Sequence, residues 1–386
     1  MFWKFTLFEM KLLLKNRKSW FIAAFLLLFF ILFFLYYSQE TPLSLADKKR
    51  IETQTSYAMF DYLDQQRHDV PEVAEVYDYH TQIQSLLGMQ VWHIAGGKDS
   101  EQYIKDGLEI NKLRLQVHEL GNAGIPDHLI TPKEEILKED ALLHFIQDNN
   151  LPIESDSFAT NHYFTSALGM MTGLLFLIIV LVSGNEMLIY EQRHQSVMRG
   201  FPLAFMHKVT SKVFIYSTHI YTFLLLGFFI SSIFLSKKIE ASEFSFPILI
   251  YQNENYLAVS TSQYLLYMFS GLALITILLI LLSILLNMLF KNAFANILIG
   301  LGIFLLPDIA AAAGFKATFL HPIKFIDMSK VLSGELATTL GNGSIDYWNT
   351  MATLGIITIL LITFIYAVNK YTYYRVPKDS PLEKAF

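Results

Sequence analysis

The chain has 386 residues, of which 53% are hydrophobic and 16% are charged, and its formal net charge at pH 7 is −5. It contains no cysteine, which excludes disulfide bridges, thiolate zinc sites and thiol nucleophiles. Six long stretches carry almost no charge, and each can cross a hydrocarbon core about 30 Å thick. We therefore expect an all-α polytopic membrane protein with six transmembrane helices. The stretches are Trp20–Gln39, Ser157–Asn185, Val213–Ser236, Asn255–Phe290, Asn292–Pro307 and Tyr347–Asn369.

The first segment, residues 1–18, is expected to be an amphipathic helix in the membrane interface, followed by the first transmembrane helix over residues 19–39. Lysines recur on one face of the segment, and Phe5, Phe8 and Leu12 share another. A basic flank that merely anchors the first span is the alternative. A cleaved signal peptide is a second alternative, but the apolar run of about 18 residues is longer than a usual signal core.

Residues 40–160 are expected to form a mostly helical extracytoplasmic domain. Thr131 to Glu134 resembles a capping box with proline at the first helical position. Upstream, Leu113 and Val117 lie on one face of a helix that Gly121 is placed to end. Residues 38–160 contain 22 acidic and 10 basic side chains. The long acidic loop does not by itself fix the orientation, because long domains are translocated largely regardless of charge.

The remaining chain, residues 161–386, is expected to form a five-span transmembrane domain. It would carry a cytoplasmic coupling helix over residues 186–203 and short outer helices over residues 308–335. Short segments rich in lysine and arginine usually face the cytoplasm, so both termini are predicted to be cytoplasmic. These basic residues are Lys4, Lys11, Lys15, Arg17 and Lys18 at the start, Arg193, Arg199, Lys208 and Lys212 before the third span, Lys291, and Lys370, Arg375, Lys378 and Lys384 at the end.

Four features in order resemble the type-2 ABC exporter permeases. These are the N-terminal interface helix, a domain after the first span, a charged inner loop and an outer motif within His321–Glu335. The inner loop has a glutamate, then Gly200 and Pro202-Leu203, and ends in Ser211-Lys212. The resemblance covers residues 1–37 and 157–386. It assigns coupling to an ATPase to Glu191, Gln192, Arg193, His194, Arg199, Gly200 and Pro202.

The resemblance implies that this chain is a transport subunit and not an enzyme. The sequence has no phosphate-binding loop of the G-x-x-x-x-G-K-[ST] type, so a separate cytosolic ABC ATPase subunit would bind ATP and Mg. A second copy of the permease or a homologue would complete the transporter. The cargo implied is hydrophobic or amphipathic: a peptide, an antibiotic or a lipid. The expected location is the plasma membrane of a Gram-positive bacterium.

Polar residues in the spans are candidates for the transport pathway, although such residues more often serve helix packing. Asp308 and His219 are the titratable groups nearest the membrane interior, where ionisable residues are functional candidates. The histidines lack metal-site spacing, no cofactor or metal site is expected in this chain, and nucleic acid is not an expected partner. A small-ion exporter and a non-transporting membrane sensor or assembly factor remain alternatives. The candidate pathway residues are Thr165, Ser166, Thr172, Asn296 and Asp308.

Overall fold

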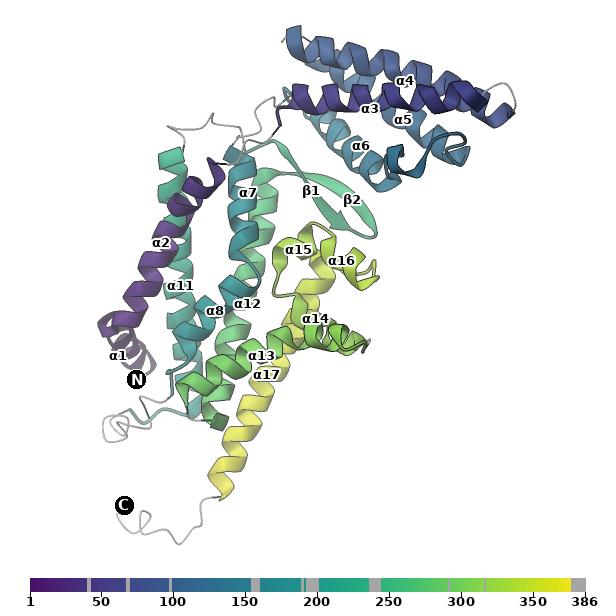
Figure 1. Ribbon diagram of the computed structural model, residues 1–386. Coiled ribbons are helices and arrows are strands. Elements are labelled where there is room, and N and C mark those ends of the chain that lie inside the picture. Colours follow the sequence, from purple (N-terminus) through teal and green to yellow (C-terminus); the bar gives the residue numbers. More distant parts are fainter. Residues whose placement is uncertain are drawn as a thin grey trace, which may run out of the picture. The chain divides into compact units, whose positions relative to one another are not determined.

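The computed structural model describes most of the chain as helices that fall into two compact units (Figure 1). The first unit combines Met1–Leu35, Ser166–Phe234 and Tyr267–Phe386, and the second combines Tyr36–Thr165 and Leu235–Leu266. Each unit is described by itself. The residues described are 1–39, 43–66, 70–96, 99–153, 160–188, 191, 201–235, 244–290, 292–315 and 317–375.

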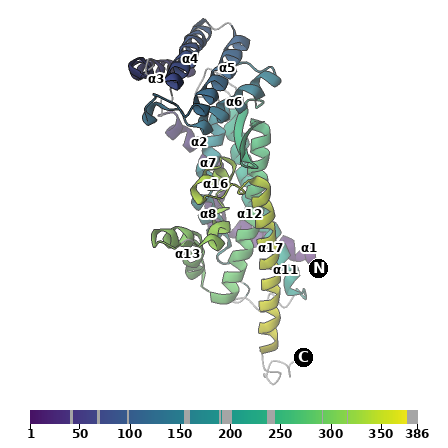
Figure 2. The ribbon, with the colours of Figure 1, turned by 90° about the vertical axis from the view of Figure 1, so that its right-hand side faces the viewer.

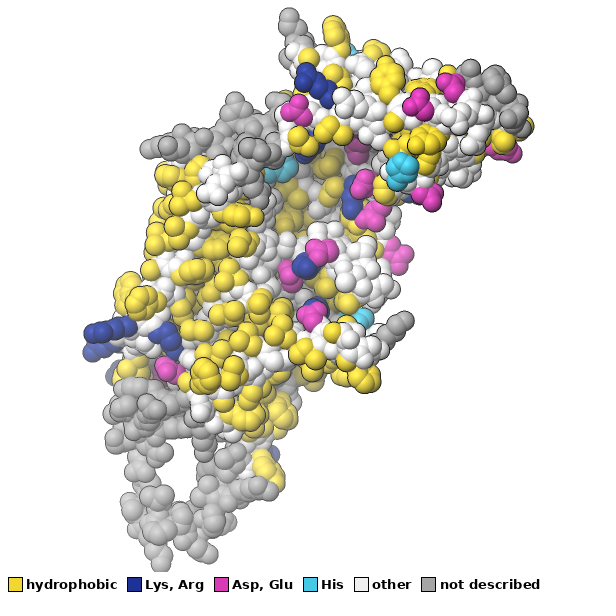
Figure 3. Space-filling view, in the orientation of Figure 1, with side chains coloured by type: hydrophobic (Ala, Val, Ile, Leu, Met, Phe, Trp, Pro, Cys, Tyr) yellow, Lys and Arg dark blue, Asp and Glu magenta, His cyan; other side chains and the backbone are white. Residues whose placement is uncertain are grey.

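Five helices among the described residues are long and apolar enough to cross a membrane, in agreement with a polytopic membrane protein. A sixth candidate is the bent pair α7 (Thr160–Met171) and α8 (Leu174–Gly184), whose axes differ by 53°. Side chains on α2 and α13 cover the surface with hydrophobic atoms (Figure 3). The five helices are α2 (Arg17–Tyr37), α11 (Phe205–Leu235), α12 (Thr261–Phe290), α13 (Ala293–Ala312) and α17 (Tyr347–Arg375).

Helix α1 (Phe2–Lys15) precedes α2, and Asn16 separates the two helices. Its buried face consists of Phe5, Thr6, Glu9 and Leu13. The apolar face predicted from the sequence is therefore turned inward in part, since Phe5 is fully buried and stacks edge-on against Phe201. Large apolar side chains and three lysines share the exposed face, as suits a helix lying in a membrane interface. They are Trp3, Leu7, Met10 and Leu14, with Lys4, Lys11 and Lys15.

Helices α2 and α11 approach each other at Gly227. A Cβ atom placed on Gly227 would lie 2.3 Å from the carbonyl oxygen of Leu26 and 3.1 Å from the Cα of Leu27. Next to this point, aromatic rings of the two helices pack edge to face, including Phe30 with Phe228. Small residues of this kind let membrane helices pack backbone against backbone.

The fifth candidate span departs from expectation at its end. The sequence suggested that Pro307-Asp308 interrupts the helix, whereas α13 continues through Pro307 to Ala312. The short outer elements begin after it, so the expected 308–335 segment starts inside a long helix. They are η2 (Thr318–Leu320), α14 (His321–Lys324), α15 (Met328–Leu332) and α16 (Glu335–Leu340).

The second unit is built on four helices that enclose two buried apolar clusters. The larger cluster joins residues of α3, α4 and α5, including Leu63, Val76, Leu87 and Ile110, all essentially inaccessible to solvent, and the smaller joins Tyr103 and Ile104 of α5 to Leu143 of α6. The helices are α3 (Leu45–Gln66), α4 (Pro71–Gly96), α5 (Ser100–Glu119) and α6 (Lys133–Asp148), with the short 3-10 turn η1 (Asp127–Leu129) between the last two.

A β-hairpin completes this unit, and the sequence analysis did not foresee it. Strands β1 (Pro247–Gln252) and β2 (Asn255–Ser260) pair antiparallel, so α12 begins only at Thr261 instead of at Asn255. Asn253 and Glu254 both have positive φ, which a two-residue turn between twisted strands requires. The hairpin packs on α6 (Figure 2). There the Tyr256 hydroxyl donates a 2.6 Å hydrogen bond to Glu134.

Candidate functional site

A buried ion cluster joins the N-terminal helix to the start of α11 in the first unit. The Lys212 ammonium lies 2.8 Å from Oε1 of Glu9 and 3.1 Å from Oε1 of Glu191. The side chains of Lys212 and Glu9 are only 2% and 3% exposed, and that of Glu191 is 15% exposed. Charges removed from water to this degree are tolerated only when they are paired. Lys212 of α11 is therefore bound to Glu9 of α1, which lies 203 residues away in the sequence.

Lys212 and its neighbour Ser211 attach α11 to its surroundings at further points. The ammonium donates a third contact to the carbonyl oxygen of Met187, at 3.0 Å. The Ser211 hydroxyl donates to Thr6 Oγ1, also at 3.0 Å and fully buried, and the Thr6 hydroxyl donates to the Phe2 carbonyl. Two consecutive residues of α11 thus bond to two residues of α1 that lie one helical turn apart.

Lys212 offsets the electrostatic cost of burying the two carboxylates beside it. Burial raises the pKa of the Glu9 carboxyl above its usual value, while the charge and hydrogen bond of Lys212 act in the opposite direction. Glu191 adds a second negative charge and raises the pKa of Glu9 further, whereas Lys208 lowers it. The two carboxylates are compatible at this depth only because Lys212 lies between them.

A second polar contact anchors the beginning of α2. The Lys18 ammonium donates to Oδ1 of Asn185 at 2.5 Å and to Oε2 of Glu186 at 3.1 Å. Glu186 is half-exposed, so this pair alone contributes little stability. Together with the Lys212 cluster, however, it links the first two helices to the segment that follows α8.

The predicted coupling residues are only partly covered by the structure. Glu191 belongs to the buried cluster, and Pro202 lies exposed in a non-helical stretch just before α11. Ser211-Lys212 is recognisable as a motif from the sequence, but no sequence pattern marks Glu9 as the partner of Lys212. The remaining predicted residues, Gln192, Arg193, His194, Arg199 and Gly200, lie outside the described residues.

Among the described residues, the five candidate pathway residues are not bonded to one another. Thr165 donates to the His162 carbonyl, Ser166 is exposed, and buried Asn296 donates to the Asn185 carbonyl at 3.3 Å. The contacts of Asn296 and Thr165 are of the kind that serves helix packing. Asp308 pairs with Lys324 near the outer elements. His219, the other titratable candidate, is buried with its ring edge-on to Phe223.

Thr172 has a more informative position, because it marks the break between α7 and α8. Its hydroxyl contacts both the Gly169 carbonyl and Oδ1 of Asp327, at 2.9 and 3.0 Å. The next residue, Gly173, has φ +69°, and a Cβ atom there would lie 2.9 Å from Oδ2 of Asp327. Burial raises the pKa of Asp327, which also caps α15. Sequence reasoning missed Asp327, although a lone glycine within an apolar run was a usable signal.

Substitution of Gly173 by alanine should destabilise the first unit by about 1–3 kcal/mol from backbone strain, with a further loss from the clash with Asp327. Gly314 is a matched control, because it also has positive φ but has no atom within 4 Å of its would-be Cβ. Thermal unfolding of the two purified variants should show the larger loss for Gly173→Ala. Equal losses would mean that Asp327 does not press on the helix break.

The absence of cysteine permits a direct test of the α1–α11 contact. We expect Thr6→Cys combined with Ser211→Cys to cross-link under mild oxidation, since the two hydroxyl oxygens are 3.0 Å apart in the wild type. Leu7→Cys with Ser211→Cys is the control, because Leu7 is 53% exposed and points away from the buried face of α1 that carries Thr6. Gel mobility after protease cleavage between the two positions distinguishes them. Cross-linking of the control alone would refute the arrangement.

No family model matches this sequence, and neither any curated protein nor any solved structure matches it significantly.

Proposed function

We propose that the chain is the membrane-spanning permease subunit of an ATP-driven ABC exporter. ATP and Mg would be bound and hydrolysed by a separate cytosolic subunit, and a second permease copy or a homologue would complete the particle. The cargo would be a hydrophobic or amphipathic molecule, such as a peptide, an antibiotic or a lipid, moved outward.

The observation that carries this proposal is the buried cluster of Glu9, Lys212 and Glu191. The resemblance to type-2 exporters assigns the glutamate and the Ser-Lys pair to the coupling segment of the inner loop, and it counts the N-terminal helix as a separate feature of the family. Glu9 of that helix is about 200 residues from Lys212 in the sequence, yet Glu9 and Glu191 both lie within 3.1 Å of the Lys212 ammonium. A generic bundle has no need to bury three charges at the end of a span, where water could solvate them at no cost.

The cluster offers a mechanical route from an ATPase to the spans. Glu191 precedes the charged segment on which the cytosolic subunit would press. The lysine transmits that displacement to α11, and Glu9 and Thr6 carry it to α1. Because α2 packs backbone to backbone against α11 at Gly227, the three helices would tilt as one rigid body.

This function requires both termini in the cytoplasm and the helices α3–α6 outside a plasma membrane. The exposed face of α1 supports such an orientation, since its lysines and apolar side chains suit the inner, anionic surface. Protease added to intact cells should cut within 40–160 and spare 186–212. Cleavage in the opposite pattern would invert the proposed topology.

The deciding experiment is purification of the tagged full-length chain from membranes of cells that express its own gene cluster. We expect an ATPase with a phosphate-binding loop to co-purify in equal amount, and the particle in nanodiscs to hydrolyse ATP. Glu191→Ala together with Arg193→Ala should leave both subunits in the membrane but uncouple hydrolysis from export. A fully active particle without a nucleotide-hydrolysing companion would favour a sensor or assembly factor instead.

A further inference from the structure

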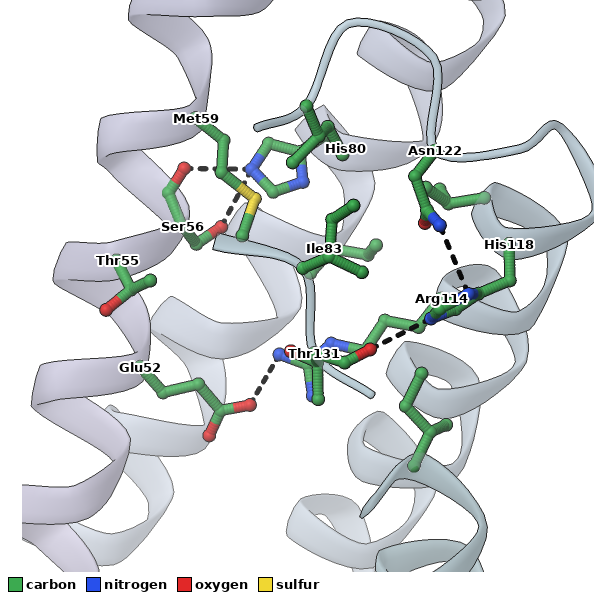
Figure 4. Close-up of a pocket in the computed structure, with 14 residues that line it drawn as sticks. Glu52, Thr55, Ser56, Met59, His80, Ile83, Arg114, His118, Asn122 and Thr131 are labelled. Atoms are coloured by element: carbon green, nitrogen blue, oxygen red, sulfur yellow. Dashed lines mark hydrogen bonds and ion pairs between the residues drawn. The ribbon is translucent and has the colours of Figure 1, made fainter. Parts of the chain in front are cut away.

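A cavity of about 230 Å³ lies inside the second unit, and the function proposed above makes no use of it (Figure 4). Cavities of roughly 150 Å³ hold benzene, so this one has room for a branched aliphatic group together with an adjoining polar group. Helices α3, α4 and α5, the segment between α5 and α6 and the first turn of α6 form its walls. Its aliphatic lining consists of Met59, Ile83, Val117, Ile125, Ile130 and Ile136.

Polar groups of both kinds, donor and acceptor, face the same cavity. Nε2 of His80 is 2.8 Å from the Ser56 carbonyl, which can only accept, so this nitrogen carries the proton and Nδ1 is left as an acceptor. Burial lowers the pKa of His80, and the charge of Arg114 lowers it further despite the bond to Ser56, so the ring is neutral at pH 7. The Arg114 guanidinium has five N–H donors, and Glu52 takes one of them at 2.5 Å.

The charges next to the cavity balance one another. Lys49 and Arg114 contact the carboxylates of Glu52 and Glu139 at distances between 2.5 and 3.7 Å. Although burial opposes it, the two cations hold the pKa of Glu52 below its ordinary value. The two cations and the two carboxylates thus pair with one another and leave no charge in excess, so the cavity itself selects an uncharged group.

The unit around the cavity has an excess of acidic side chains, which favours a cationic ligand. Residues 38–160 contain 22 acidic and 10 basic side chains, and Asp and Glu side chains of this unit are visible at its surface in Figure 3. Such an excess attracts cations and accelerates their binding. A ligand suited to this unit thus combines positive charges on its outside with an uncharged aliphatic group that can enter the cavity.

We propose that the cavity binds an aliphatic side chain of a cationic peptide. The neighbouring peptide unit supplies the matching polar atoms: its carbonyl accepts from Arg114, and its N–H donates to Nδ1 of His80. Basic residues on either side of the aliphatic one meet the acidic surface. This binding requires no ATPase, and it is independent of whether the chain transports the peptide.

The test uses the full-length chain in phosphatidylcholine nanodiscs and the fluorescently labelled peptide acetyl-Lys-Lys-Leu-Lys-Lys-amide. We expect it to bind about tenfold more tightly, or better, than the same peptide with serine in place of leucine, because burial of a leucine side chain contributes about 1.5–3 kcal/mol. The all-glutamate analogue of the leucine peptide should bind more weakly than the lysine form. Equal affinities in either comparison would refute the proposal.

Two matched threonine variants locate the site. Thr55 lines the cavity and Thr81 lies exposed on α4, and each hydroxyl donates only to the carbonyl four residues earlier in its own helix. Thr55→Trp should abolish the preference for leucine over serine, whereas Thr81→Trp should leave it unchanged. Thr131→Trp fills the cavity from another segment and replaces Thr55→Trp if that variant melts below the wild type.

The remaining outcomes also decide the question. If discrimination survives in both filling variants, the leucine binds elsewhere and the proposal is wrong. If N-acetyl-leucine amide competes as strongly as the lysine peptide, the site is one for small neutral molecules and the peptide assignment fails. Loss of leucine preference in the filled variants, with the exposed control intact, supports the assignment.

Discussion

Replacement of Lys212 by methionine should detach α1 from α11 and, on the proposed transport function, abolish coupled export while the chain still inserts into the membrane. The substitution removes the one cation that lies between two buried carboxylates, and it leaves Glu9 at 3% exposure without a counter-charge. Breaking a buried pair from one side costs about 3–5 kcal/mol. This cost exceeds the free energy that we expect the remaining contacts between α1 and α11 to contribute. We therefore expect α1 to separate from α11.

Lys208→Met on the same helix is the matched control. Lys208 lies about one turn earlier, half-buried over the Phe5 ring, and it pairs with no carboxylate in the described part of the chain. Its loss should cost well under 1 kcal/mol. Amide hydrogen exchange of α1 distinguishes the variants: protection should collapse in Lys212→Met and persist in Lys208→Met. Unchanged protection in both variants would show that the cluster does not hold α1.

Acidification should partly rescue the Lys212 variant. Without the lysine, burial and repulsion by the Glu191 carboxylate raise the pKa of Glu9 in the docked state above its value in the undocked state. The docked state then binds more protons, so docking becomes more favourable as the pH falls toward the raised pKa of Glu9. Exchange rates corrected for their intrinsic pH dependence should therefore recover protection of α1 between pH 7 and 5. The Lys208 variant should show no such recovery.

The parts of this fold that were predictable from sequence are those dominated by hydrophobicity. Runs without charge identify the membrane helices because a single buried charge is expensive in lipid. Helical spacing of Leu113 and Val117 likewise revealed α5, whose buried face they occupy. Charge-free runs and helical spacing of apolar residues are both local patterns that extend over many residues. They can therefore be recognised without knowledge of the tertiary contacts.

Features that depend on one residue and a distant partner were missed. Glu9 looked like an ordinary charge in a basic helix, and only its contact with Lys212, 203 residues away, shows its role. The hairpin escaped because its turn residues, Asn253 and Glu254, lack the glycine that usually marks positive φ, and because β2 continues directly into an apolar helix. Asp327 was missed for a similar reason, because its role depends on its contacts with Thr172 and Gly173 at the helix break, which are distant in the sequence.

The close contact between α2 and α11 depends on Gly227 of α11, which has no side chain. Gly227→Ala should separate α2 from α11, since the added methyl would lie 2.3 Å from the Leu26 carbonyl oxygen. Neither backbone can give way by a rotamer change, so the helices must move apart and lose the ring contacts on both sides, including Phe30 with Phe228. Overpacking of this kind costs about 1–3 kcal/mol, and unrelieved contact with backbone belongs at the upper end.

Gly302→Ala in α13 provides the contrast. Its would-be Cβ meets no atom within 4 Å, so the substitution should only bring the gain of roughly 1 kcal/mol that alanine has over glycine in a helix. We expect thermal unfolding in nanodiscs to move in opposite directions for the two variants. If the chain is the permease proposed above, export should fail in Gly227→Ala even where the protein remains folded, because α2 and α11 would no longer tilt as one rigid body. A Gly227 variant with normal stability and normal export would mean that the two helices move independently.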